Sequence, residues 1–206
     1  MQPYTTVSGT ASASITEKKS EFIANVSFVN TEEAALAFLQ GIKAQHRTAR
    51  HNVYAYQLRE GNRQRYSDDG EPAKTAGLPT LECITHAGLT DVIVVVTRYF
   101  GGTLLGTGGL VRAYTAATQA ALAAAQIVTV SVCVGVQFTV PYALYEQADK
   151  LCREAGAHMD APQFAGEVTL SATLLAGAEA PLLQALQELT RGSAQVTVSA
   201  PYYAPF

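Results

Sequence analysis

The sequence predicts an α+β protein of two domains, a sheet covered by helices and then a ferredoxin-like unit. Residues 92–97 are all β-branched, which is typical of a strand buried on both faces. A glycine-rich turn and an alanine-rich helix over residues 115–125 follow this strand. From residue 127 onward, alternating strands and amphipathic helices recur in the order β-α-β-β-α-β.

The elements before residue 92 are predicted from alternation, capping residues and proline. Asn30 and Thr31 precede two acids, Glu32 and Glu33, as at the start of a helix. Pro79 begins a shorter helix. In order, we expect strands over 5–16, 21–29 and 52–58, helices over about 31–43 and 79–86, and a polar loop over 60–74.

The second domain is predicted mainly from one strand, in which valines and Phe138 alternate with small polar residues over 130–140. Leucines then recur at helical spacing in two segments. We expect further strands over 158–163, 167–174 and 195–199 and helices over 144–152 and 182–189. The boundary is placed near Gln126, which gives domains of residues 1–126 and 127–206.

Composition limits the classes of protein. A chain of 206 residues with 48% hydrophobic and 15% charged residues fits a folded protein rather than a disordered one. The net charge of −3 gives no overall basic character. Residues 1–126 carry +1 and residues 127–206 carry −4, so contact with a polyanion is expected in the first domain.

The cysteines and the apolar runs lead to further expectations. Cys83, Cys133 and Cys152 are scattered, which disfavours a disulfide framework or a zinc site. The N-terminal residues lack the pattern of a signal peptide, and no run reaches the ~18 apolar residues of a membrane span. We therefore expect a cytoplasmic protein with no membrane contact, no cofactor and no metal.

The segment after the central strand is rich in glycine, and Arg98 and Arg112 lie on either side of it. A glycine turn that leads into a helix directs backbone N–H groups at an anion, so Thr107 and the glycines are candidates to bind phosphate or sulfate. The glycines are Gly101, Gly102, Gly106, Gly108 and Gly109. A P-loop would need lysine at Thr107, and a dinucleotide fingerprint would need a small residue at Val111. The alternative is a turn that only lets the helix pack on the strand.

Three motifs resemble those of the IMPACT/YigZ family: RYFGGTLLGTGGLVRAY over 98–114, ARHNVYAY over 49–56, and YSDDGEP over 66–72 with TAG at 75–77. The resemblance implies domains similar to domains IV and V of elongation factor G. The eukaryotic relatives regulate translation initiation under amino-acid starvation, and the bacterial members have no settled activity. Ala73 and Lys74 depart from the small pair resembling Ser-Gly that the family pattern leads us to expect.

A basic segment near the end of the first helix is a candidate contact for phosphates. It comprises Lys43, His46, Arg47, Arg50 and His51. With Arg98 and Arg112 it would form a surface that binds nucleic acid or another anion. The alternative is that these cations meet the negative end of the helix dipole.

The polar loop is a second candidate, through Tyr66, Asp68, Asp69, Gly70 and Glu71. Its acids are expected to shape a turn, and replacing both aspartates by asparagine is expected to leave the fold intact. Acid–base chemistry and metal binding with the histidines are alternatives. Cys83 with His86 is a candidate nucleophile pair, against the commoner buried thiol.

Three classes of function therefore stay open. The favoured one is a non-enzymatic, translation-associated protein that contacts RNA or the ribosome through the first domain. The second is a protein-interaction module that regulates translation or a stress response without RNA contact. The third is a hydrolase or nucleotide-binding enzyme that uses the glycine loop with Asp68, Asp69 and Glu71. Convergence of Arg47, His51, Arg98 and Arg112 on the loop would favour the first or third, and dispersal would favour the second.

Overall fold

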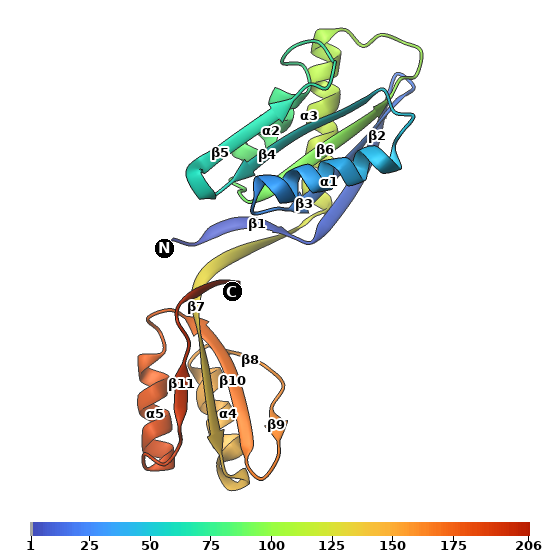
Figure 1. Ribbon diagram of the computed structural model, residues 1–206. Coiled ribbons are helices and arrows are strands. Elements are labelled where there is room, and N and C mark those ends of the chain that lie inside the picture. The colour runs from blue at the N-terminus through green and yellow to red at the C-terminus, as the bar shows by residue number, and fades with distance from the viewer. Residues whose placement is uncertain (1) are drawn as a thin grey trace. The chain divides into compact units, whose positions relative to one another are not determined.

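The computed structural model describes residues 2–206 and divides into two compact units (Figure 1). One comprises Tyr4–Val128. The other comprises Thr129–Phe206 with the first residues of the chain. Both combine sheets with helices, which confirms the predicted α+β class. Within the described residues, no helix has both the length and the apolar character to cross a membrane.

The N-terminal unit is built on a five-stranded sheet of order β2-β3-β6-β4-β5. All neighbouring strands in this order pair antiparallel. The strands are β2 (Thr10–Glu17), β3 (Ser20–Phe28), β6 (Val92–Tyr99), β4 (His51–Leu58) and β5 (Arg63–Ser67). The edge strand expected over 5–16 is split into β1 (Tyr4–Ser8) and β2, because Gly9 has a φ of 68° and turns the chain.

Helices cover both faces of this sheet (Figure 1). Helix α1 (Glu32–Gln45), capped by the Thr31 hydroxyl, packs on the face that carries Ile93 and Val95. Helices α2 (Gly77–His86) and α3 (Thr107–Ala124) pack on the face that carries Val94 and Val96. The central strand β6 is therefore buried on both faces, as its β-branched run predicted.

Strand β5 corrects the expected polar loop over 60–74. A 3₁₀ turn, η1 (Glu60–Asn62), leads into β5, which pairs with β4 over residues 63–67. The sequence RQRYS has no apolar alternation because β5 is an edge strand with largely exposed side chains. Its conformation comes from the neighbouring strand rather than from its own pattern.

The C-terminal unit is ferredoxin-like. Its strands lie in the order β11-β7-β10-β8, all antiparallel, and leucines of two helices bury the alternating face of β7. The order confirms the β-α-β-β-α-β prediction. The elements are β7 (Gln126–Val140), η2 (Tyr142–Leu144), α4 (Tyr145–Glu154), β8 (His158–Met159), β9 (Gln163–Phe164), β10 (Val168–Leu175), α5 (Ala180–Thr190), β11 (Val196–Val198) and β12 (Tyr202–Pro205). Strand β12, which also pairs with β7, was not predicted.

Candidate functional site

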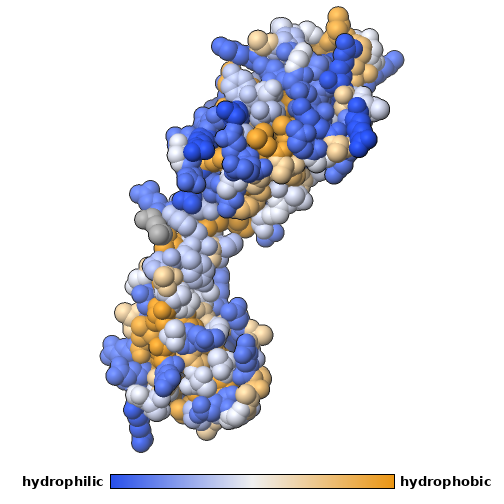
Figure 2. Space-filling model, viewed as in Figure 1, coloured by the Kyte–Doolittle hydropathy of each residue, from blue (hydrophilic) through white to orange (hydrophobic). Residues whose placement is uncertain are grey.

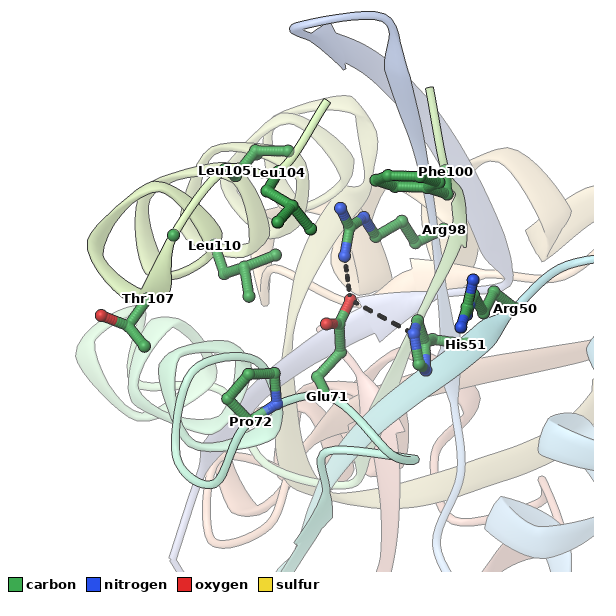
Figure 3. Close-up of a pocket in the computed structure, with 11 residues that line it drawn as sticks. Arg50, His51, Glu71, Pro72, Arg98, Phe100, Leu104, Leu105, Thr107 and Leu110 are labelled. Carbon is green, nitrogen blue, oxygen red and sulfur yellow. Dashed lines mark hydrogen bonds and ion pairs between the residues drawn. The ribbon is translucent and has the colours of Figure 1, made fainter. Parts of the chain in front are cut away.

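A pocket of about 430 Å³ opens in the N-terminal unit, next to the segment that joins β6 to α3 (Figure 3). This volume lies in the range of small-ligand sites. One side of the lining is polar and the other is apolar. The polar side comprises Arg50, His51, Glu71, Arg98, Gly106 and Thr107, and the apolar side comprises Pro72, Phe100, Leu104, Leu105 and Leu110.

A buried ion pair lies at the base of this pocket. Arg98 Nη1 donates to Glu71 Oε1 at 2.6 Å, and the two residues are only 5% and 8% exposed. The Tyr114 hydroxyl donates to the same oxygen at 2.8 Å. The charges compensate each other, as buried charges must. Within residues 2–206, Arg98 Nε is nevertheless buried without a hydrogen-bond partner.

His51 extends this network. Its Nδ1 lies 2.8 Å from the backbone carbonyl oxygen of Asp69. Because a carbonyl oxygen only accepts, Nδ1 carries the proton. Nε2 lies 3.9 Å from Glu71 Oε1, and the two form an ion pair only when Nε2 is protonated as well (Figure 3). The pocket base therefore holds donors and acceptors in fixed orientations.

The two aspartates of the YSDDGEP motif are structural. Asp68 accepts from the backbone N–H groups of Lys74, Ala76 and Gly77, which ties the loop to the start of α2. Asp69 accepts from the backbone N–H of Asn52 at 2.7 Å and pairs with Lys43. These contacts argue against the expectation that replacing both aspartates leaves the fold intact. Glu71 is the acid of this motif that lines the pocket.

Two other predicted residues of the motif support the loop from its sides. Gly70 has a φ of 88°, and its α-carbon lies beside the His51 ring. Tyr66, on β5, packs against the core cluster under α2 and α3. A Cβ added at Gly77 would meet the Tyr66 ring at 2.9 Å, so the chain is tightly packed here. Gly70 and Tyr66 therefore support the turn that carries Glu71.

The glycine loop leads into α3, which begins at Thr107 with Gly106 as its N-cap. The Leu110 N–H is the first to bond within the helix, to the Gly106 carbonyl, so the N–H groups of Thr107, Gly108 and Gly109 have no intrahelical partner. No side chain caps this end. Positive φ occurs at Gly102 (87°) and Gly106 (71°) but not at Gly108, which therefore does not need glycine for its backbone conformation.

Gly101 has a different role, since a Cβ there would lie 2.0 Å from the backbone carbonyl carbon of Lys19. The β2–β3 turn, Lys18 and Lys19, therefore lies directly against the glycine loop. Both lysines have positive φ and exposed side chains. Sequence reasoning missed them, although the Lys-Lys pair between two predicted strands was a usable signal.

The predicted cations are divided between separate places. Arg50 and His51 line the pocket with Arg98, whereas Arg112 lines a second hollow of about 220 Å³ with Lys18. Leu105 lines both hollows. Arg47 lines neither of them, and its Nε donates to the Ala44 carbonyl. The structure thus gathers Arg50, His51, Arg98, Gly106 and Thr107 around one pocket and leaves Arg47 and Arg112 outside it.

Cys83 does not have the environment of a nucleophile. Its thiol contacts the Thr115 carbonyl oxygen, and burial followed by the nearby Glu82 carboxylate raises its pKa. A raised pKa keeps the thiol protonated at neutral pH. No group of three or more His, Cys, Asp or Glu residues within 2–206 is arranged to hold a metal ion.

Comparisons with known proteins identify the two units. The Impact N-terminal domain model matches residues 18–122, and a domain of unknown function, DUF1949, matches residues 138–193. The fold and these matches define a two-domain protein with an Impact-type first domain. The chain belongs to the IMPACT family, as its motifs predicted.

Two bacterial relatives and one solved structure show how far the similarity extends. The "IMPACT family member in pol 5'region" of Thermus thermophilus is 41% identical over 178 residues, 85% of this chain and 96% of that protein. The IMPACT family member YvyE of Bacillus subtilis is 48% identical over 115 residues, 55% of this chain and only 53% of YvyE. A crystal structure of a hypothetical protein aligns with a TM-score of 0.63 and 30% identity, covering 95% of this chain and 97% of its own.

Proposed function

We propose that this protein is a non-enzymatic, translation-associated regulator whose N-terminal unit contacts RNA or the ribosome. The contact surface is the "basic end", defined as Lys18, Lys19, Arg50 and Arg112 around the start of α3. The observation that carries the proposal is that these four cations come from three distant segments and surround a helix end with free N–H groups.

The charges of the basic end are available to a partner. Within residues 2–206 none of its four side chains is in an ion pair, and all four residues are exposed. By contrast, Arg63 and Arg65 of the same unit are paired with Glu32. Unpaired cations beside a helix N-terminus suit a chain of phosphates, which are held mainly by charge and N–H donors.

Two further considerations support a regulator over the enzyme alternative. The chain belongs to the IMPACT family, and the resemblance to this family implies a role like that of its eukaryotic relatives, which regulate translation initiation. The enzyme alternative used the glycine loop with Asp68, Asp69 and Glu71, and of these acids the two aspartates have their carboxylates occupied by backbone N–H groups. A regulatory contact without a reaction therefore fits the geometry best.

Salt-dependent RNA binding tests the proposal. The double variant Lys18→Asn with Lys19→Gly removes two positive charges. It also places Asn-Gly in the turn, a pair of residues that readily adopts the positive φ angles found there. The binding constant of the wild type for single-stranded RNA should fall steeply as the salt concentration rises. In a plot of the logarithm of this constant against the logarithm of the salt concentration, the double variant should have a slope that is smaller in magnitude by about 1.4, about 0.7 for each lost phosphate contact.

The matched control removes two charges from another edge of the same unit, as Arg63→Ala with Arg65→Ala. This control should bind RNA with the wild-type slope. Absence of RNA binding at low salt, or equal loss in both double variants, contradicts the proposal.

A further inference from the structure

The pocket next to the basic end has three zones with different chemistry, and the innermost is polar. All contacts of the Glu71 carboxylate within residues 2–206 use Oε1. Figure 3 shows its other oxygen on the side of the carboxylate that faces Leu110. Arg98 Nε is a buried donor without a partner. A ligand that reaches the base therefore meets the second oxygen of Glu71 as an acceptor, beside the paired Arg98 guanidinium.

The middle of the pocket is apolar and partly open. Leu104 is 82% exposed and Phe100 is 42% exposed, and both line the pocket with Leu105 and Leu110. Figure 2 shows hydrophobic surface among hydrophilic neighbours at the end of the N-terminal unit that carries the segment between β6 and α3. Such side chains suit the faces of a flat, apolar ring.

The mouth of the pocket is positive. Arg50 lies there, unpaired and exposed, and Gly106 and Thr107 form the opposite rim at the start of α3. The free N–H groups and the dipole of α3 add partial positive charge at this rim. An anionic group is therefore favoured at the mouth, whereas the Glu71 carboxylate disfavours one at the base.

Each simpler ligand leaves one zone unsatisfied. An aliphatic chain would desolvate the second oxygen of the Glu71 carboxylate without offering it a hydrogen bond. A small anion would leave the apolar walls uncovered. The ligand must carry an N–H donor at its inner end, a flat apolar ring in the middle and an anion at its outer end.

We propose that this pocket binds one nucleotide unit, with the base inside against the leucines and Glu71 and the phosphate at the mouth beside Arg50. The inference deepens the proposed function, on which it rests for one of two sources. The unit is either an unpaired nucleotide of a bound RNA or a free nucleoside monophosphate. Both present the same base and phosphate to the pocket. The sequence has no P-loop motif, so the base is held by stacking and the phosphate by charge.

A tryptophan placed in the apolar middle of the pocket reports occupancy directly. The chain contains no tryptophan, so Leu104→Trp introduces a single tryptophan at an exposed pocket residue, and its emission can be excited selectively. A base that stacks beside it should quench its emission in a saturable way. The matched control is Leu36→Trp on α1, an exposed leucine of the same unit away from the pocket. The probes are the four nucleoside monophosphates, a single-stranded RNA oligonucleotide and inorganic phosphate.

Saturable quenching of Leu104→Trp but not Leu36→Trp, by the monophosphates or by the oligonucleotide, is the expected result, and which of the two quenches identifies the source. An equal response to inorganic phosphate alone overturns the inference, because it shows an anion site without base recognition. RNA binding measured by another method, with no change at Leu104→Trp, also overturns it while the proposed function stands. Quenching by monophosphates without any RNA binding keeps the inference and removes the proposed function.

Arg50→Ala tests the phosphate end of the ligand independently of the base end, because Arg50 is not part of the buried network of Glu71, Arg98 and Tyr114. In the Leu104→Trp background it should weaken monophosphate binding by about tenfold, through loss of a charge-assisted contact, and leave binding of the corresponding nucleoside unchanged. An equal loss for nucleoside and monophosphate contradicts the placement of the phosphate at the mouth. Glu71→Gln should weaken binding of both by about tenfold.

Discussion

Glu71 and Arg98 are 27 positions apart in the sequence, yet Glu71 Oε1 and Arg98 Nη1 lie 2.6 Å apart in a buried pair. The pair joins the YSDDGEP turn to the end of β6, two of the three motifs that mark the family. Phe22 and Phe100 lie against the guanidinium, with its carbon 5.4 Å and 5.6 Å from the ring centroids. The base of the pocket is thus part of the folded core as well as of the site.

Glu71→Ala should destabilise the N-terminal unit by about 3–5 kcal/mol, because it leaves the Arg98 charge buried without its partner. Equilibrium urea unfolding of the full chain measures this loss. Glu33→Ala, at an exposed acid of α1, is the control and should change stability by about 1 kcal/mol or less. Equal effects of the two changes would show that the buried pair contributes little.

Tyr56→Phe should make the unit less sensitive to alkaline pH. Burial, and then the hydrogen bond to Glu32, raise the pKa of Tyr56 to about 12 from an ordinary value of 10.0. Between pH 10 and 12 the unfolded chain releases this proton while the folded chain keeps it, so stability falls as pH rises, by up to about 1.4 kcal/mol per pH unit. The variant should lack this component in urea midpoints measured from pH 9 upward.

Tyr142→Phe, at an exposed tyrosine of the other unit, provides the comparison for this experiment. The pH dependence of the N-terminal unit should be unchanged in it. Burial and the Glu71 carboxylate also raise the pKa of Tyr114, so a residual alkaline loss should persist in Tyr56→Phe. A Tyr56→Phe profile that coincides with the wild type contradicts the assignment.

Asp68→Ala should destabilise the protein by about 1–2 kcal/mol or more, because three backbone N–H groups lose their acceptor. Hydrogen exchange should show the loss concentrated at Ala76 and Gly77, where α2 begins. Asp160→Ala, at a residue of the C-terminal unit, should leave exchange at these amides unchanged. If exchange at both amides stays slow in Asp68→Ala, the carboxylate is not what holds this helix start.

Gly101→Ala and Gly41→Ala should have opposite effects. A Cβ at Gly101 would lie 2.0 Å from the backbone of Lys19, so the glycine loop and the β2–β3 turn would have to separate. Gly41 lies within α1 with open space around it, and alanine there should stabilise the helix by about 0.5–1 kcal/mol. Thermal unfolding should therefore show a lower midpoint for the first and a higher one for the second. A neutral Gly101→Ala would contradict the close approach.

The parts of this protein that were predictable from sequence are those whose signals are local. The β-branched run of β6 identifies a buried strand within a few residues of its observed bounds, whereas α3 begins at Thr107, ahead of the alanine-rich segment that predicted it. Strand β5 was missed because its pairing partner, β4, determines its conformation. The role of Glu71 was only partly visible, since its burial depends on Arg98 and Tyr114, which lie far along the chain.

The contacts of Asp68 and Asp69 have a kinetic consequence for any ligand that reaches Glu71. Their carboxylates fasten the turn to α2, to β4 and, through Lys43, to α1. The acceptor at the base of the pocket is therefore immobilised during folding, before a ligand arrives. This turn does not have to order around the bound molecule, so it loses little conformational entropy on association. We expect the association rate to be set by encounter with the open mouth rather than by a slow closing step.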